Sequence, residues 1–200
     1  GPEPRTVNTI GYGIVAGTIR RHAGPELAAR LLRPLATGEE KWCQLFSEPG
    51  AGSDLAGLAT RAVRDGEGWR VTGQKVWNSL AHISRWAILL ARTDPDVPKH
   101  KGLTYFILDM ESPGVEVRPL RQLTGRAQFN EVFLDDVYIP DTQRFGDVGA
   151  GWIVANSTLG DERTSLGDRV AARGSGAIAD ALELWAAHPE RHTPVLRDRL

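Results

Sequence analysis

The chain has 200 residues, of which 41% are hydrophobic and 24% are charged, as is usual for a globular protein that stays in water. Its 24 basic and 25 acidic residues leave a formal net charge of -1, which excludes the bulk charge that attracts nucleic acid or an acidic membrane surface. The single cysteine, Cys43, excludes an internal disulfide, and the lack of a Cys/His cluster makes a metal site unexpected.

The first forty residues have the pattern of a helical hairpin. Apolar residues recur at helical spacing between residues 8 and 22, and Gly24 stops the pattern. Pro25 suits a helix start, so we expect a second short helix, which ends before Pro34. We interpret residues 1–40 as the end of an N-terminal helical domain.

Residues 41–145 consist of short β-rich runs separated by turn signals, which favours antiparallel sheets over β-α-β units. Asp65-Gly66-Glu67-Gly68 predicts a hairpin because glycine accepts positive φ. A polar stretch with prolines, Thr93 to Lys101, predicts a surface loop. We expect strands at 41–46, 61–64, 69–72, 74–79, 86–91, 103–108, 115–117 and 129–134. Such a set predicts an antiparallel β-sandwich or partial barrel as the middle domain.

The helical period returns in the last part of the chain, after a short linker. The residues predicted to share one helix face are Trp152, Ala155, Leu159, Leu166 and Val170. We interpret residues 146–200 as the first part of a C-terminal helical bundle, which another chain or further C-terminal sequence would complete. The predicted fold class is therefore α+β.

Membrane and export signals are not apparent in the sequence. No run approaches the 18 or so apolar residues of a membrane-spanning helix. The N-terminus lacks the basic-then-apolar layout of a signal peptide. We therefore expect a cytoplasmic protein without a membrane, nucleic-acid or metal partner.

The stretch from Trp42 to Asp54, W-C-Q-L-F-S-E-P-G-A-G-S-D, leads from a strand-forming half into a glycine-rich loop. Glycines allow a backbone to approach a ligand closely, and the free N–H groups and hydroxyls of such a loop can bind anionic or carbonyl oxygens. The alternative is an ordinary Gly/Pro loop between strands.

Three further motifs follow: G-Q-K-V-W-N-S at 73–79, F-N-E-V-F-L-D-D-V-Y-I-P at 129–140 and L-G-D-E-R at 159–163. Together with the E-P-G-A-G-S-D loop, and at these separations, they resemble the acyl-CoA dehydrogenase family, in particular its bacterial members of fatty-acyl and steroid catabolism. The resemblance covers essentially the whole chain, as part of a protomer. It implies an FAD enzyme that desaturates an acyl-CoA thioester between Cα and Cβ and passes electrons to electron-transferring flavoprotein. It also implies a homo- or hetero-oligomer, a dimer or tetramer.

The resemblance assigns five residues to the flavin. Gln44, Phe46 and Ser47 lie where the family's first strand edges the isoalloxazine ring, Trp77 matches a tryptophan beside it, and Ser79 matches a residue that hydrogen-bonds near N5. Both serines stand where many members have threonine, and both keep the hydroxyl. They can equally be solvent-facing strand hydroxyls.

Trp77 has a second interpretation as well. A tryptophan in a strand is usually a core or interface residue. We expect this plainer role for the tryptophans at Trp42, Trp69 and Trp86. The motif around Trp77 favours the flavin role there.

The resemblance also assigns residues to substrate and catalysis. Ser53 matches a serine that faces the CoA portion of the substrate, and Arg163 lies beside the active site. Most family members carry the base on a later bundle helix, which this chain does not contain. In the isovaleryl-CoA and long-chain branches the base is a Glu directly before an Arg, the place of Glu162. The alternative is a solvated charge that pairs with Arg163 or Arg169.

Two other functions are compatible with these residues. One keeps the scaffold and changes the reaction, as in the acyl-CoA oxidases and flavin monooxygenases. The other is a non-catalytic subunit of a hetero-oligomeric acyl-CoA dehydrogenase, which supplies part of a partner's FAD site. The acyl group, straight-chain, branched or steroid, is not readable from this part of the protein.

Overall fold

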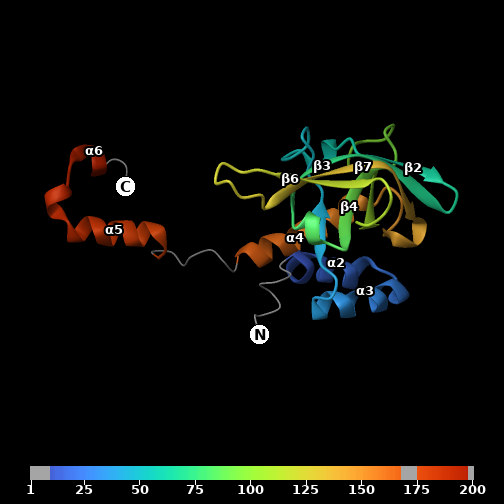
Figure 1. Cartoon of the computed structure of the whole chain (residues 1–200), viewed down its shortest axis with the longest axis horizontal. Helices are drawn as coiled ribbons and strands as arrows, with labels where there is room; N and C mark the ends of the chain where they lie inside the picture. Colours follow the sequence, from blue (N-terminus) through green and yellow to red (C-terminus); the bar gives the residue numbers. More distant parts are fainter. Residues whose placement is uncertain (1–9, 168–174, 198–200) are drawn as a thin grey trace. The chain divides into compact units, whose positions relative to one another are not determined.

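A computed structural model describes residues 10–167 and 175–197 of the chain, which divides into two compact units, Gly1–Arg163 and Thr164–Leu200. The first unit combines helices with one eight-stranded sheet (Figure 1), so the predicted α+β class is confirmed. The division into segments 1–40, 41–145 and 146–200 stays a prediction. Arg169 and Val170 lie outside the described residues.

The predicted N-terminal helices are present, with one correction. They are η1 (Gly11–Val15), α2 (Ala16–His22) and α3 (Pro25–Thr37). The prediction that the second helix ends before Pro34 was wrong, because the helix continues through Pro34 to a left-handed cap at Gly38, with φ of 77°. A proline inside a helix costs a hydrogen bond. The extra turn buries Leu35, and this burial offsets the cost.

The sheet runs in the order β6-β7-β3-β2-β4-β5-β8, with β1 paired to β4. The strands are β1 (Trp42–Leu45), β2 (Arg61–Asp65), β3 (Gly68–Ser79), β4 (Trp86–Arg92), β5 (Leu103–Asp109), β6 (Val115–Leu120), β7 (Phe129–Pro140) and β8 (Arg144–Phe145). The β2–β3 hairpin turns through Gly66, with φ of 56°, as predicted.

The strand pairs are not all antiparallel, contrary to expectation. β1 runs parallel to β4, with Trp42 opposite Trp86, and β2 meets β4 in parallel at Arg61. Parallel strands need a long crossover connection. Here the loop, β2, β3 and the short helix η3 (Ala81–Ile83) between β1 and β4 provide it. The sequence pattern of single strands carries no sign of this crossover.

The strands β4 and β5 are buried on both faces and separate two cores. On one face they contact the helices, in a cluster that includes Ile19, Leu31, Ile88, Leu90, Tyr105, Ile107 and Val154. On the other face they contact β3 and β7, in a cluster that includes Val71, Ala87, Leu89, Phe106, Leu108, Val132 and Ile139. Figure 1 shows α2 and α3 along one side of the sheet. The sheet therefore bends over the second cluster as an open, partial barrel.

The helix α4 (Gly151–Gly167) begins in the first unit, where Ala155 is buried and Leu159 packs against the helix-facing core, as the periodicity predicts. The second unit contains α5 (Ala177–Ala187), η5 (Pro189–Arg191) and α6 (Pro194–Arg197). Within it the rings of Trp185 and His192 stack at 3.9 Å. None of the helices in the described residues has the length and apolarity needed to cross a bilayer.

A buried ion pair joins two of the sequence motifs inside the first unit. Lys75 of β3 has no exposed side-chain surface, and its Nζ donates to Glu48 Oε1 at 2.8 Å, to Phe46 O at 3.0 Å and to Leu90 O at 2.8 Å. Glu48 also accepts the N–H groups of Ala59 at 2.6 Å and Thr60 at 2.9 Å. All three ammonium protons thus have acceptors, as a buried lysine requires.

Burial and ion pairing have opposite effects on the pKa of each partner, and burial dominates for Lys75 whereas pairing and hydrogen bonding dominate for Glu48. Burial lowers the pKa of the Lys75 ammonium to about 8, although attraction to Glu48 acts in the opposite direction. Burial by itself raises the pKa of Glu48, but Lys75 and the hydrogen bonds from Thr60 and Ala59 outweigh it and hold that pKa below its usual value. The carboxylate is therefore ionised at neutral pH and fixes the loop to the sheet.

We expect Lys75→Met to lower the free energy of unfolding by about 3–5 kcal/mol, because it leaves Glu48 buried without its counter-charge. The matched control is Lys99→Met, which removes an exposed ion pair to Asp54 and should cost less than about 1 kcal/mol. Denaturant unfolding of both variants measures the difference. Equal losses would contradict a special role for the buried pair.

We expect ionisation of Glu48 to contribute to the pH dependence of the free energy of unfolding. Its pKa in the folded state lies below the ordinary 4.5, so its contribution is complete above about pH 4.5 and is lost as the pH falls through the folded-state value. The midpoint of thermal unfolding, recorded between pH 3 and 7, should fall more steeply for the wild type than for Glu48→Gln. Parallel curves for the two proteins would rule this contribution out.

Candidate functional site

The two most distinctive motifs lie side by side in the first unit. The second half of β3 runs along β1 and its following loop, where the Val76 N–H donates to Ser47 O at 2.9 Å. Asn78 Nδ2 donates to Gln44 O at 2.8 Å. The Gln44–Ser47 and Trp77–Ser79 segments thus form one edge, which we call the β1–β3 edge.

An irregularity in β3 determines how Trp77 is presented. The register between β3 and β7 shifts between Lys75 and Asn78, and Trp77 has φ of 63°. This left-handed conformation is rare for a bulky residue and marks a position held by its surroundings. Trp77 is 62% exposed, and its ring meets Phe129 edge-on at a centroid distance of 6.0 Å.

The core interpretation is therefore wrong for Trp77. It is right for the other three tryptophans that the sequence assigned to the core, since Trp42, Trp69 and Trp86 are 0%, 5% and 2% exposed. A large, exposed aromatic surface at a strained position is suited to a flat ligand.

Two buried asparagines hold this irregularity, and sequence reasoning missed them. Asn78 is 2% exposed and Asn130 is 0% exposed. Asn130 Nδ2 donates to Asn78 O at 2.9 Å and lies 3.3 Å from His82 Nδ1. Asparagine is depleted in strands, so its presence at two facing strand positions was the available signal. Together the amides link β1, β3 and β7.

Glu162 reaches the β1–β3 edge from α4. Gln44 Nε2 donates to Glu162 Oε2 at 3.5 Å, and both side chains are half-buried. Arg163, one of the two arginines that the alternative interpretation pairs with Glu162, has an exposed side chain. The amide oxygen of Gln44, Oε1, is buried and has no partner among the described residues.

Polar contacts with α2 and β5 fix the position of α4 and therefore of Glu162. Thr158 shares hydrogen bonds with Thr18 of α2 at 2.9 Å and with Tyr105 of β5 at 3.1 Å. One turn on, Asp161 pairs with Arg21 of α2. Burial raises the pKa of Tyr105 well above its usual range, so its hydroxyl stays protonated.

His22 provides a further contact between α2 and α4. Its Nε2 lies 2.8 Å from Ser157 Oγ. Burial, together with the neighbouring Arg21, lowers the pKa of the His22 imidazole. At neutral pH the ring is therefore uncharged, and the contact between α2 and α4 is a neutral hydrogen bond.

The remaining predicted residues occupy different surroundings. The Phe46 ring is 2% exposed and meets Tyr105 edge-on at 5.7 Å, inside the helix-facing core. Any contact of Phe46 with a ligand would therefore come from its backbone. Ser47 and Ser79 are half-buried on the β1–β3 edge, and Ser53 is exposed in the glycine loop. Lys99 holds that loop through Asp54, at 2.8 Å.

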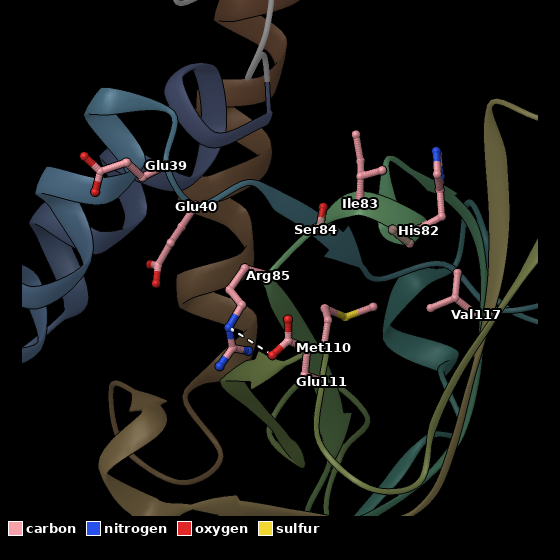
Figure 2. A pocket seen from close by; sticks show the side chains of 10 residues that line it. Glu39, Glu40, His82, Ile83, Ser84, Arg85, Met110, Glu111 and Val117 are labelled. Atoms are coloured by element: carbon pink, nitrogen blue, oxygen red, sulfur yellow. Dashed lines mark ion pairs between the residues drawn. The ribbon is translucent and has the colours of Figure 1, made fainter.

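A separate cavity of about 620 Å³ lies where the end of α3 meets η3 and the β4–β5 end (Figure 2). Its lining includes Glu40, His82, Ser84, Arg85 and Met110. None of the eight predicted site residues lines it. The predicted site and this cavity are therefore different places. His82, which lines the cavity, contacts Asn130.

The comparisons with known proteins agree on one family. Residues 43–137 match the family model "Acyl-CoA dehydrogenase, middle domain". The chain is 58% identical over 151 residues to the acyl-CoA dehydrogenase FadE34 of Mycobacterium tuberculosis, an alignment that covers 76% of this chain and 21% of that protein.

Solved structures of this kind share the fold. The "Tcur3481-Tcur3483 steroid ACAD G363A variant" has a TM-score of 0.79 and 28% identity, over 98% of this chain and 50% of the other. A glutaryl-CoA dehydrogenase of Mycobacterium smegmatis in complex with FADH2 has a TM-score of 0.71 and 27% identity, over 81% of this chain and 41% of the other. The chain thus spans half or less of the length of each of these three proteins.

We expect Asn78→Leu to lower the free energy of unfolding by about 1–3 kcal/mol, because it leaves the backbone carbonyl of Gln44 without the hydrogen bond that Asn78 Nδ2 donates. The matched control is Asn156→Leu, which removes a hydrogen bond to Trp152 O from an exposed residue of α4 and should change stability by less than about 0.5 kcal/mol. Denaturant titration compares them. A neutral Asn78→Leu would mean that the irregularity of β3 does not depend on this amide.

Proposed function

Because the chain belongs to the acyl-CoA dehydrogenase family, we propose that the protein dehydrogenates an acyl-CoA thioester to the 2-enoyl-CoA with FAD, and that the electrons pass to electron-transferring flavoprotein. The observation that carries this proposal is the position of Glu162, whose carboxylate meets the β1–β3 edge through Gln44. A carboxylate at the edge of a flat, aromatic binding surface is suited to proton abstraction.

The residues of the β1–β3 edge fit a flavin. Trp77 offers an exposed indole, Ser47 and Ser79 offer half-buried hydroxyls, and Gln44 Oε1 is a buried acceptor that lacks a donor among the described residues. A solved relative that contains FADH2 supports the assignment. When bound, FAD supplies the two-electron acceptor for the hydrogen at Cβ. The protein supplies the surface that orients it.

In the proposed reaction, Glu162 accepts the proton from Cα of the thioester while a hydride leaves Cβ. The electron pair of the former Cα–H bond becomes the second bond between Cα and Cβ. A thioester α proton is weakly acidic, so hydrogen bonds to the thioester oxygen must stabilise the developing negative charge. Arg163 lies next to the base and is assigned to the substrate, as is Ser53 on the glycine loop.

The proposal also covers the class of acyl group in the substrate and the protein subunits with which the chain assembles. A structural relative named a steroid ACAD supports steroid-type thioesters as the first substrates to test. The same relative is named with two protein designations, which supports an oligomer with a second subunit of the family. It also keeps the non-catalytic role open. A cytoplasmic location belongs to the proposal too.

The central test of the proposed base is Glu162→Gln in protein expressed from the complete gene. We expect acyl-CoA turnover to fall by at least about 10³-fold, because the amide cannot accept the α proton, while FAD content stays unchanged. Glu26→Gln, an exposed residue in the first turn of α3, is the control and should retain full activity.

Three results would change the assignment. Activity of Glu162→Gln near the wild-type level would dismiss Glu162 as the base. Oxygen consumption with peroxide release during wild-type turnover would favour an acyl-CoA oxidase. A purified protein that turns over no acyl-CoA alone, and supports turnover only with a second subunit that carries its own base, would favour the non-catalytic role.

A further inference from the structure

Gln44 occupies an unusual position for a polar side chain. Along β1 and the residue after it, Cys43 and Leu45 belong to the core under the bent sheet, whereas Trp42 and Phe46 belong to the helix-facing core. Alternate residues of a strand share a face, so Gln44 lies on the helix-facing side between two buried aromatics. A buried amide is costly there unless it is hydrogen-bonded.

In the described residues, the amide nitrogen of Gln44 has a hydrogen-bond partner and the amide oxygen has none. Its Nε2 donates to Glu162 Oε2 at 3.5 Å, and its Oε1 is buried with no partner in the described part of the chain. The opposite amide orientation would set a carbonyl oxygen against the carboxylate, which has no proton to donate when ionised. The N–H group therefore faces Glu162.

The backbone of Gln44 and the helix that carries Glu162 are both held in place. Asn78 Nδ2 binds Gln44 O at 2.8 Å. On the other side, Thr158 contacts Thr18 and Tyr105, and Asp161 pairs with Arg21. The amide and the carboxylate thus meet from two fixed elements. Their distance of 3.5 Å is long for a hydrogen bond, and contacts of this kind tighten when substrate closes the site.

We propose that Gln44 is a positioning residue for the base: it donates its N–H to the Glu162 carboxylate and holds that group toward the substrate. The proposal rests on the proposed function of Glu162. It goes beyond the flavin contact that the family resemblance implies for Gln44, because it assigns the donor end of the amide to the base. The acceptor end stays available to the flavin.

Gln44→Met tests the proposal in protein expressed from the complete gene, since methionine keeps the shape and loses the donor. We expect kcat to fall about tenfold, the effect of one hydrogen bond to a charged group. KM for acyl-CoA should stay unchanged. Methionine also lacks the Oε1 acceptor assigned to the flavin, so FAD content and the flavin reduction potential are measured in the same protein, and the double-mutant cycle with Glu162→Asp separates a flavin effect from the effect on the base. The control is Gln74→Met, which breaks another bond between a Gln and a Glu, from Gln74 Nε2 to Glu131 Oε1 at 3.1 Å, and should leave kcat unchanged.

A double-mutant cycle with Glu162→Asp shows whether Gln44 acts through the base. Aspartate keeps a carboxylate but retracts it from Gln44, so Gln44→Met should change kcat less than about twofold in that background. A full tenfold effect in both backgrounds would overturn the proposal and return Gln44 to the flavin alone.

Further results distinguish failure of the positioning role from failure of the base assignment and from misfolding of the variant. If Glu162→Gln retains full turnover, the base assignment fails first and the positioning role falls with it. If Glu162 is essential and the cycle is additive, only the positioning role fails. Should Gln44→Met not fold, Gln44→Glu replaces it, because a second carboxylate of the same shape should repel Glu162 and lower kcat further, whereas unchanged kcat would overturn the proposal.

Discussion

The buried pair of Lys75 and Glu48 is the interaction on which the rest of the first unit depends. It joins the G-Q-K motif to the E-P-G-A-G-S-D motif in the interior, where Lys75 also binds backbone carbonyls after β1 and in β4. A buried charge pair is stabilising only when its geometry is good and its remaining donors and acceptors are hydrogen-bonded, and both conditions are met here. Beyond Lys75, β3 therefore runs beside β1 in a fixed register, and the two halves of the proposed site share one edge.

From that register the site follows in steps. The irregularity after Lys75 turns Trp77 outward at φ of 63°, and two buried asparagines hold it. Polar contacts along α4 bring Glu162 to the same edge. The exposed aromatic surface, the half-buried hydroxyls and the carboxylate thus come from three separate segments that the core holds together.

The sequence predicted the β2–β3 hairpin and the positions of most strands, because these depend on local pattern, but it divided β3 at Gly73, ended β7 at Leu134 and missed β8. It failed where long-range contacts decide. The burial of Leu35 carries α3 past Pro34, and the crossover that makes β1 parallel to β4 has no local signal. Glu48 and Lys75 were visible in their motifs, but their partnership was not. The contact of Gln44 with Glu162 spans 118 residues and could not be predicted from spacing.

The most direct test of the account is an anaerobic titration of FAD-reconstituted protein from the complete gene with acyl-CoA thioesters. If the β1–β3 edge and Glu162 form a dehydrogenation site, a straight-chain, branched or steroid thioester will bleach the visible absorbance of bound flavin and yield the 2-enoyl-CoA. Protein that binds no FAD on reconstitution, or that keeps its flavin oxidised with all three classes of thioester, would contradict the account.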